Sequence, residues 1–193
     1  MEIQILQLGM LQTNCYLVWG SGSSCVVIDP GDQAYRVQEA LEKLGKTQEA
    51  ILLTHGHFDH VGAVRDLVAE YACPVYLCQA DLSLPPRMTG GDLYCTHNYQ
   101  EGDTLTLAGL CFTVLHTPGH TPGCVCLQCA DALFTGDTLF AGSIGRTDFP
   151  GSSPEQMAKS LKRLTQISEN YRIFPGHGEA STLDEEKRSN PYL

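Results

Sequence analysis

Basic residues and long apolar stretches are both scarce in this chain of 193 residues, and each scarcity disfavours a class of function. The chain has 12 Lys and Arg residues against 22 Asp and Glu residues, so its formal net charge at pH 7 is −10. No run of Lys and Arg occurs, so we do not expect nucleic acid as a partner. No stretch approaches the ~18 apolar residues of a membrane helix, and the N-terminus lacks a leader pattern. We therefore expect a cytoplasmic protein without a membrane partner.

The nine cysteines lack the secretory signal that normally accompanies a disulfide framework, so reduced thiols are expected. Cys124, Cys126 and Cys129 form one dense group, and the last two have C-x-x-C spacing. The same segment also has the pattern of a strand with Cys at small apolar positions, and no second close pair completes a four-sulfur site. We prefer the strand interpretation. A redox or metal role for this cysteine trio is the alternative.

The periodicity of apolar residues predicts sheets covered by helices. Strand patterns occur at residues 3–8, 14–19, 24–28, 50–53, 74–77, 104–107, 110–115, 125–127, 132–134 and 171–174. Helical spacing occurs at residues 37–44, 61–71 and 154–168, with Ser153 as N-cap of the last helix. Residues 84–99, which contain several Pro and Gly residues, do not predict a helix or a strand. Strands come first and then alternate with helices, and no linker divides the chain, so we expect one core and one domain.

Three histidines and a carboxylate are concentrated in Thr54–His60, which has the sequence THGHFDH. Because a strand pattern precedes this segment and a helical pattern follows it, His55–His60 are predicted to form a strand-to-helix loop. Imidazoles and carboxylates are the ligands that borderline cations such as zinc prefer. Burying several of them without a cation would leave polar groups unsatisfied. The segment therefore predicts a metal site.

Further polar groups follow three of the predicted strands: His116-Thr-Pro-Gly-His120, Thr135-Gly-Asp137 and Pro175-Gly-His177. If these strand ends converge, one edge of the sheets carries all the candidate ligands. Glycine directly precedes His120, Asp137 and His177, and it allows a sharp backbone turn with little bulk beside a cation. The three groups are thus expected to complete the site that begins at His55.

With these motifs in this order, the chain resembles the metallo-β-lactamase superfamily, in its glyoxalase II-like branch of small metallohydrolases. The resemblance extends from residues 13–17 and 28–31 to residues 190–193. Its specificity lies in HxHxDH followed by a later His, an Asp and a final His. It implies an α/β fold, called α+β in some schemes, built as a four-layer αββα sandwich in one domain, residues 1–193.

The resemblance also implies a binuclear metal site. It assigns the first ion to His55, His57 and His120, the second ion to Asp59, His60 and His177, and a bridging position to Asp137. Two divalent ions are expected, zinc first, while iron and manganese suit the same ligand types. Asp59 is expected to be a ligand that orients water, and Asp137 to hold a metal-bridging hydroxide. Two ions sharing a water lower its pKa, which creates a nucleophile without a dedicated protein base.

Residues outside the ligand set have expected supporting roles. Asp29 resembles the carboxylate that orients metal-site histidines, although an Asp before Pro-Gly also suits a turn. Arg146 aligns with the basic residue that binds the glutathione carboxylate in glyoxalase II, and an ion pair with Asp148 is its alternative role. His97 and His116 lie outside the ligand pattern, and His116 is a candidate to support the ligands.

Hydrolysis of an acyl-thioester is the expected activity, with conversion of S-lactoylglutathione to D-lactate and glutathione as the leading example. A thiolate with a pKa near ~8.5 can leave with little protonation, whereas an amine needs a proton delivered. The chain ends soon after His177, without the C-terminal helical domain of full-length glyoxalase II. The acyl group, the thiol carrier and the oligomeric state therefore stay open.

Other functions compete with this expectation. Persulfide dioxygenase resembles the chain around residues 145–148 and uses one iron, whereas the contexts of His60 and His177 favour two metals. Lactamase activity ranks lower because no secretory signal is present, and nuclease activity ranks lower because the chain is acidic. Flavin-linked relatives usually carry an acid at the position of His57. A metal-binding module without turnover is the remaining alternative.

Overall fold

Two six-stranded sheets form the centre of the molecule, which a computed structural model describes over residues 1–193. The first sheet contains, in spatial order, β1 (Glu2–Leu8), β2 (Thr13–Trp19), β3 (Ser24–Ile28), β4 (Thr47–Leu52), β5 (Val75–Cys78) and β6 (His97–Tyr99). The second contains β14 (Ser181–Thr182), β13 (Arg172–Pro175), β10 (Ala132–Gly136), β9 (Val125–Cys129), β8 (Leu110–His116) and β7 (Thr104–Leu107). A separate hairpin pairs β11 (Leu139–Phe140) with β12 (Ser143–Ile144).

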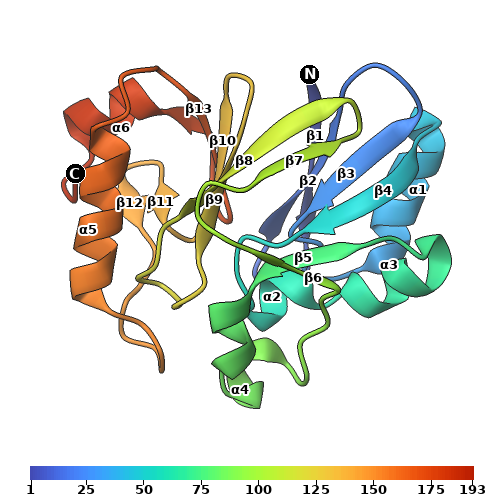
Figure 1. Ribbon diagram of the computed structural model, residues 1–193, viewed down its shortest axis with the longest axis horizontal. Helices are drawn as coiled ribbons and strands as arrows, with labels where there is room; N and C mark the ends of the chain where they lie inside the picture. Colours follow the sequence, from blue (N-terminus) through green and yellow to red (C-terminus); the bar gives the residue numbers. More distant parts are fainter.

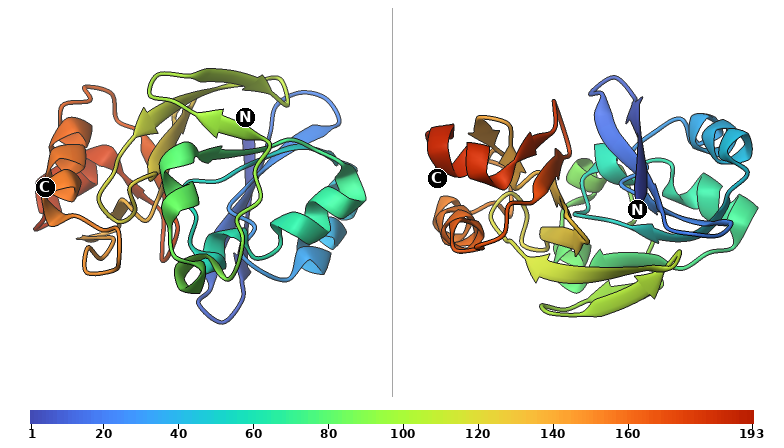
Figure 2. Two further views of the ribbon diagram at one scale, coloured as in Figure 1. Left: turned by 60° about the horizontal axis from the view of Figure 1, so that its bottom comes forward. Right: turned by 90° about the horizontal axis from the view of Figure 1, so that it is seen from above.

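Helices cover the outer face of each sheet. The helices are α1 (Ala34–Leu44), α2 (Phe58–Val61), α3 (Val64–Tyr71), the 3-10 turn η1 (Gln79–Ser83), α4 (Pro86–Thr89), α5 (Pro154–Thr165) and α6 (Leu183–Ser189). Figure 1 shows α1 and α3 beside the first sheet, and α5 and α6 beside the second. The turned views in Figure 2 keep these two helical layers at opposite ends of the molecule. The predicted four-layer αββα sandwich is confirmed.

Three apolar cores correspond to the three interfaces between these layers. β4 contributes to two of them, because Leu52 belongs to the core between the sheets, together with Phe134, while its neighbour Ile51 belongs to the core on the α1 and α3 side. A strand buried on both faces needs apolar residues at every position, as residues 50–53 have. Leu161 of α5 contributes to the third core, against the second sheet. None of the helices combines the length and apolar character needed to cross a bilayer.

The two sheets meet along the edge where β4, β10 and β13 end. The main-chain N–H of Val125 donates to the Thr54 carbonyl at 2.9 Å. The N–H of Asn14 donates to the Gly176 carbonyl at 2.8 Å. Both bonds join one sheet to the other, so the segments that follow these strands are brought together, as expected.

The helix predicted over residues 61–71 is wrong in one respect, because the structure divides it into α2 and α3. The N–H of Ala63 donates to the Pro30 carbonyl at 3.0 Å, outside the helix. A Cβ on Gly62 would lie 2.3 Å from the Gly31 carbonyl oxygen, so the chain crosses residues 30–31 in close contact. The first of the two helices, α2, begins at Phe58, so His60 lies on a helical turn and not in the predicted loop.

Short elements were the ones that periodicity did not predict. Residues 84–99 contain α4 and β6, and the C-terminal residues form β14 and α6. In α6 only Leu183 and Glu186 are buried, so no apolar stripe is available to recognise. The other longer elements were confirmed in type, although the helix predicted over residues 154–168 ends at Thr165. The Ser153 N-cap of α5 was also confirmed, and its hydroxyl accepts from the N–H of Gln156.

Candidate metal centre

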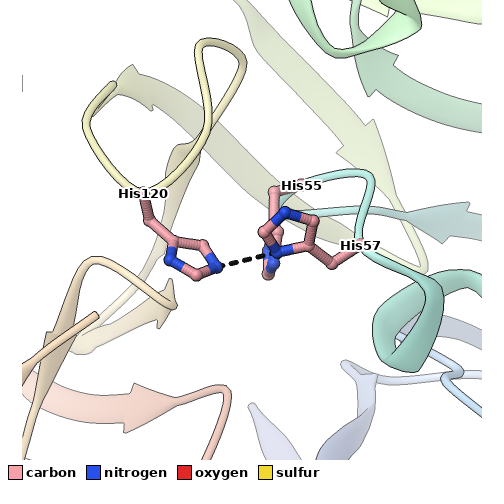
Figure 3. A group of neighbouring side chains, drawn as sticks. All are labelled: His55, His57 and His120. Atoms are coloured by element: carbon pink, nitrogen blue, oxygen red, sulfur yellow. Dashed lines mark hydrogen bonds between the residues drawn. The ribbon is translucent and has the colours of Figure 1, made fainter. Parts of the chain in front are cut away.

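All seven predicted ligands lie together at the edge where the sheets meet. Their ligand atoms form three overlapping groups, each within 4.8 Å: His55, His57 and His120; His55, His60 and Asp137; and Asp59, His60 and His177. Figure 3 shows His55 and His57, which follow β4, pointing toward His120, which follows β8. Four of the seven come from the first sheet's side and three from the second, so the site exists only when both sheets are in place.

Asp29 holds two of the histidines through its carboxylate. Its Oδ2 accepts from His60 Nδ1 at 2.9 Å and from the Thr54 hydroxyl at 2.6 Å, and its Oδ1 accepts from the Thr54 N–H at 2.7 Å. Because the Thr54 hydroxyl donates to Asp29, it is available to accept from His55 Nδ1, 3.1 Å away. Both imidazoles then carry their proton on Nδ1 and direct the Nε2 lone pair into the cluster.

The other ligands are oriented by main-chain and side-chain contacts. His120 Nδ1 lies 2.8 Å from the Arg146 carbonyl, which leaves its Nε2 facing His57 Nδ1 at 2.8 Å. Asp59 Oδ2 accepts from the Thr13 hydroxyl at 3.0 Å and lies 3.2 Å from His177 Nε2.

Asp137 lies between the two histidine groups. Its Oδ1 is 3.4 Å from His60 Nε2, and its Oδ2 is 3.4 Å from His120 Nε2. Gly176 is needed here, because a Cβ at this position would lie 2.2 Å from Asp137 Oδ1. Glycine is needed at position 119 for a different reason, because a Cβ there would collide with Met157 of α5 and not with the ligand cluster.

Unpartnered buried atoms show that the cluster fits a cation. Nε2 of His55, His57 and His60 and Oδ1 of Asp137 are buried without a hydrogen-bond partner. Leaving a buried polar atom unpaired costs roughly 1–3 kcal/mol, so four in one cluster would be a heavy penalty unless a ligand satisfies them. Mixed imidazole and carboxylate donors of this kind suit zinc and other divalent transition metals.

Protonation states also suit a cation. Burial lowers the pKa of His55, and burial together with His120 lowers the pKa of His57 to about 4, so both rings keep a free lone pair near neutral pH. Burial opposes ionisation of Asp59 and Asp137, yet the neighbouring His60 and His177 outweigh it and lower both carboxyl pKa values. His55 and His57 therefore provide neutral imidazoles, and Asp59 and Asp137 provide ionised carboxylates, the forms that bind metals. Burial opposes protonation of His60 and His177, yet the neighbouring carboxylates outweigh it and raise the pKa of both rings, so a bound cation would displace a proton there.

A cavity of about 540 Å³ opens over the cluster. Its apolar lining consists of Leu11, Phe58, Met88, Phe140, Ile144 and Phe149. Its polar lining consists of His57, Asp59, His120, Asp137, His177, Arg87 and Arg146. Every imidazole and carboxylate in this lining thus belongs to the ligand cluster, and the two arginines are the other charged groups.

Arg146 lies on the rim of the cavity in a fixed orientation. Its Nε and Nη2 donate to the two carboxylate oxygens of Asp148 at 2.6 and 2.8 Å, and its guanidinium lies 3.9 Å from the centroid of the Phe149 ring. The ion pair with Asp148 is therefore present. Nη1 has no protein partner and is available to a ligand.

The structure places two further sequence candidates away from the ligands. His116 Nε2 contacts the Pro122 carbonyl at 2.9 Å and makes no hydrogen bond to any of the seven ligands, so it contacts the loop that carries His120 and not a ligand. The cysteine trio is buried in and beside β9, which confirms the strand interpretation. All nine cysteines are free thiols, and none belongs to a cluster of ligand atoms.

One residue of the site was missed from the sequence. Asp81, in η1, is fully buried and hydrogen-bonds to both loops that carry the three-histidine group. Burial raises the pKa of its carboxyl, and its three donors oppose that effect. A single Asp shortly after β5 carries no pattern of its own, so only its contacts reveal it.

Comparison with known proteins agrees with this geometry. Residues 8–177 match the family model described as the metallo-beta-lactamase superfamily. The chain is 36% identical to hydroxyacylglutathione hydrolase GloC of Haemophilus influenzae, an alignment that covers 100% of this chain and 98% of that protein.

Solved structures give the same picture. BLEG-1, described as a B3 metallo-beta-lactamase, has a TM-score of 0.92 and 34% identity, with 100% of this chain and 99% of that chain covered. TTHA1623 in a di-iron-bound form has a TM-score of 0.87 and 42% identity, covering 98% and 100%. ETHE1 from Myxococcus xanthus has a TM-score of 0.87 and 30% identity, covering 99% and 84%.

Proposed function

Since the chain belongs to the metallo-β-lactamase superfamily and is a metallohydrolase of that family, we propose that its substrates are acyl-thioesters. One divalent ion would be held by His55, His57 and His120, a second by Asp59, His60 and His177, with Asp137 shared between them. Zinc is our first choice because of the imidazole-rich ligand set. Iron is the alternative, since a relative of 42% identity is described in a di-iron-bound form.

The protein's own groups prepare this site for the ions. Asp29 and the Arg146 carbonyl occupy the Nδ1 side of His60 and His120, so their Nε2 lone pairs face the cluster. The carboxylates of Asp59 and Asp137 supply negative charge on the cavity side. When bound, two divalent ions activate a water molecule and polarise a substrate carbonyl.

The lining of the cavity supports a thioester over an amide. Each imidazole and carboxylate that faces the cavity is a member of the ligand cluster, and Arg87 and Arg146 are the remaining titratable groups. An arginine stays protonated at neutral pH and does not act as a proton donor to a leaving group. A thiolate, with a pKa near ~8.5, leaves without such a donor, whereas an amine does not.

The same lining supports an anionic thiol carrier. Apolar side chains such as Phe140 and Phe149 accommodate carbon chains, and the free Nη1 of Arg146 is suited to a carboxylate. Glutathione carries two carboxylates in addition to its thiol. S-lactoylglutathione is therefore the leading substrate, which also accords with the name of the GloC relative.

The experiment is a substrate panel run on protein whose metal content has been measured. We expect two metal ions per chain and hydrolysis of S-lactoylglutathione in preference to a neutral acyl-thioester of the same acyl group. Arg146→Ala is expected to raise KM for S-lactoylglutathione about tenfold at unchanged kcat, because a binding contact is lost. Arg172→Ala is the matched control, since Arg172 forms the same bidentate pair with Asp131 away from the cavity.

Three other outcomes would replace this proposal. One bound iron with oxygen uptake on glutathione persulfide would establish dioxygenase activity, the alternative with which the ETHE1 neighbour is consistent. Hydrolysis of a β-lactam and of no thioester would favour lactamase activity, which the 34% identity to BLEG-1 places on the panel. Two bound metals with no turnover of any substrate would indicate a binding module.

A further inference from the structure

Asp81 lies at the centre of a buried junction between the two sheets. Its side chain is fully buried in η1, and three groups donate to it. Oδ2 accepts from the Gly56 N–H at 2.8 Å and from the Thr121 hydroxyl at 2.9 Å, while Oδ1 accepts from the Gly123 N–H at 2.6 Å. One carboxylate therefore connects segments that are far apart in the sequence.

The two connected segments are the loops that carry the three-histidine group. Gly56 lies between His55 and His57, and Thr121 directly follows His120. Asp81 makes no hydrogen bond to any of the seven ligand side chains. Its contacts reach the histidines only through the backbone, so it acts on the distance and angle between the loops.

Close packing leaves this carboxylate no room to shift. A Cβ on Gly123 would lie 2.6 Å from both Cγ and Oδ1 of Asp81, and a Cβ on Gly56 would lie 3.3 Å from its Cβ and 2.9 Å from Leu93 Cδ1. Both loops therefore need glycine where they contact Asp81. The separation of the loops is set by the size of one aspartate side chain.

The three hydrogen bonds to Asp81 also require an acceptor at each oxygen position, which a carboxylate provides. All three partners are donors, and an ionised carboxylate is an acceptor at both oxygens. An amide in its place would turn an N–H group toward at least one of these donors and leave it unpaired. Buried donors without an acceptor are costly, so the loops would move to relieve them.

We propose that Asp81 is a positioning residue that sets the affinity of the first metal ion by fixing the His55–His57 loop against the His120 loop. This inference rests on the proposed two-metal site. Asp81 makes no hydrogen bond to Asp59, His60 or His177. Its removal is therefore expected to weaken binding of the first ion and to leave binding of the second ion unchanged. A purely structural residue would affect both ions through a general loss of stability.

The test is a metal titration of Asp81→Asn and Asp81→Ala protein after chelation, with Co²⁺ as the probe and a chelator as competitor. Loss of a group that orients metal ligands typically weakens metal binding about 10- to 100-fold. We expect the affinity for one of the two ions to fall by this factor and the dissociation constant of the other ion to stay unchanged. A His177→Ala variant, which lacks a member of the second group, assigns the affected ion spectroscopically.

Glu186→Gln is the matched control. Glu186 is also a buried carboxylate that accepts from a main-chain donor, the Gly142 N–H at 2.8 Å, and from Asn190 Nδ2 at 2.8 Å, but it contacts no ligand loop. We expect this variant to melt at a lower temperature and to bind both ions as the wild type does. If Asp81→Ala does not fold, the test uses Asp81→Asn together with Thr121→Val. The second variant removes the hydroxyl that donates to Asp81 Oδ2.

The outcomes separate this inference from the proposed function. Equal binding of both ions by wild type and Asp81→Asn, or equal weakening of both ions, overturns the role of Asp81. Failure of the wild type to bind metal overturns the proposed metal site itself. Weakening of one ion only, absent from Glu186→Gln, supports the inference.

Discussion

At the scale of single residues, three histidines, His55, His60 and His120, each depend on one oxygen partner for their protonation and direction. Asp29 accepts from His60 directly and reaches His55 through Thr54, while a backbone carbonyl serves His120. Asp29 has φ of 51°, in the left-handed region that Asp tolerates better than most residues. This strained conformation turns its carboxylate toward both partners at the end of β3.

Replacement of Asp29 by Asn tests this orientation. The Asp29 carboxylate accepts three hydrogen bonds at two oxygens, whereas an amide has one acceptor oxygen. The Thr54 N–H can only donate, so we expect the amide oxygen to face it and the NH2 group to face His60, which then loses its fixed tautomer. We expect metal binding at the Asp59, His60 and His177 group to weaken about 10- to 100-fold, measured by chelator competition. Asp103→Asn, in an exposed loop where the carboxylate accepts from the Gln100 N–H, serves as control. Unchanged affinity in Asp29→Asn would remove Asp29 from the site.

The cysteine trio yields a prediction about thiol reactivity and pH. Burial raises the pKa of Cys126 and of Cys129 to about 11, and raises that of Cys124 as well. A raised thiol pKa keeps the thiol protonated, so the reactive thiolate is scarce at pH 8 and increases only as the pH approaches 11.

We therefore expect iodoacetamide at pH 8 to label exposed Cys111 in the native protein and to leave the trio unlabelled, as read by mass spectrometry of peptides. Denatured protein, in which all nine thiols are accessible, is the control. Rapid labelling of Cys126 in the folded protein would restore the redox interpretation of the C-x-x-C spacing.

At the scale of elements, the break between α2 and α3 positions Asp59 and His60, two predicted ligands of the second group. The turn formed by Phe58–Val61 presents Asp59 and His60, and residues 30–31 cross directly beneath Gly62. A continuous helix through residues 61–71 would leave no path for this crossing. The break is therefore a tertiary feature that overrides a good local helical pattern.

Gly62→Ala tests the crossing. Its Cβ would lie 2.3 Å from the Gly31 oxygen, so α2 or the residue 30–31 segment must move. We expect a loss of about 1–3 kcal/mol in the free energy of unfolding, together with weaker binding of the second ion. Ala69→Ser, at an exposed position in α3, is expected to change the stability by about 0.5 kcal/mol or less. A variant as stable as wild type would show that the crossing is not tight.

At the scale of the whole molecule, the ligands join the two halves of the sandwich. His55, His57, Asp59 and His60 lie on the side of the first sheet, while His120, Asp137 and His177 follow strands of the second. A cation bound by both sets stabilises the folded state alone, because the unfolded chain does not hold the ligands together.

Removal of metal by a chelator is therefore expected to lower the melting temperature. At a free metal concentration of about 1,000 times Kd, each bound ion contributes about 4 kcal/mol. In a chain of this size that corresponds to a fall of roughly 8–16 °C for each ion that chelation removes, measured by calorimetry. His177→Ala is expected to lose only part of this difference, since the first group stays intact. A melting temperature unaffected by chelation would mean that metals do not connect the sheets.

The sequence by itself predicted the seven side chains that meet at the candidate metal centre, and it predicted the layers of the fold. Both signals depend on residues that are close in the sequence. His55–His60 is a dense motif, and alternating or helical spacing of apolar residues involves only near neighbours. The tertiary structure alone decided the rest. Asp81 and the break at Gly62 depend on segments that meet in space, and neither a lone buried aspartate nor a glycine in a helical pattern carries a local signal of its partner.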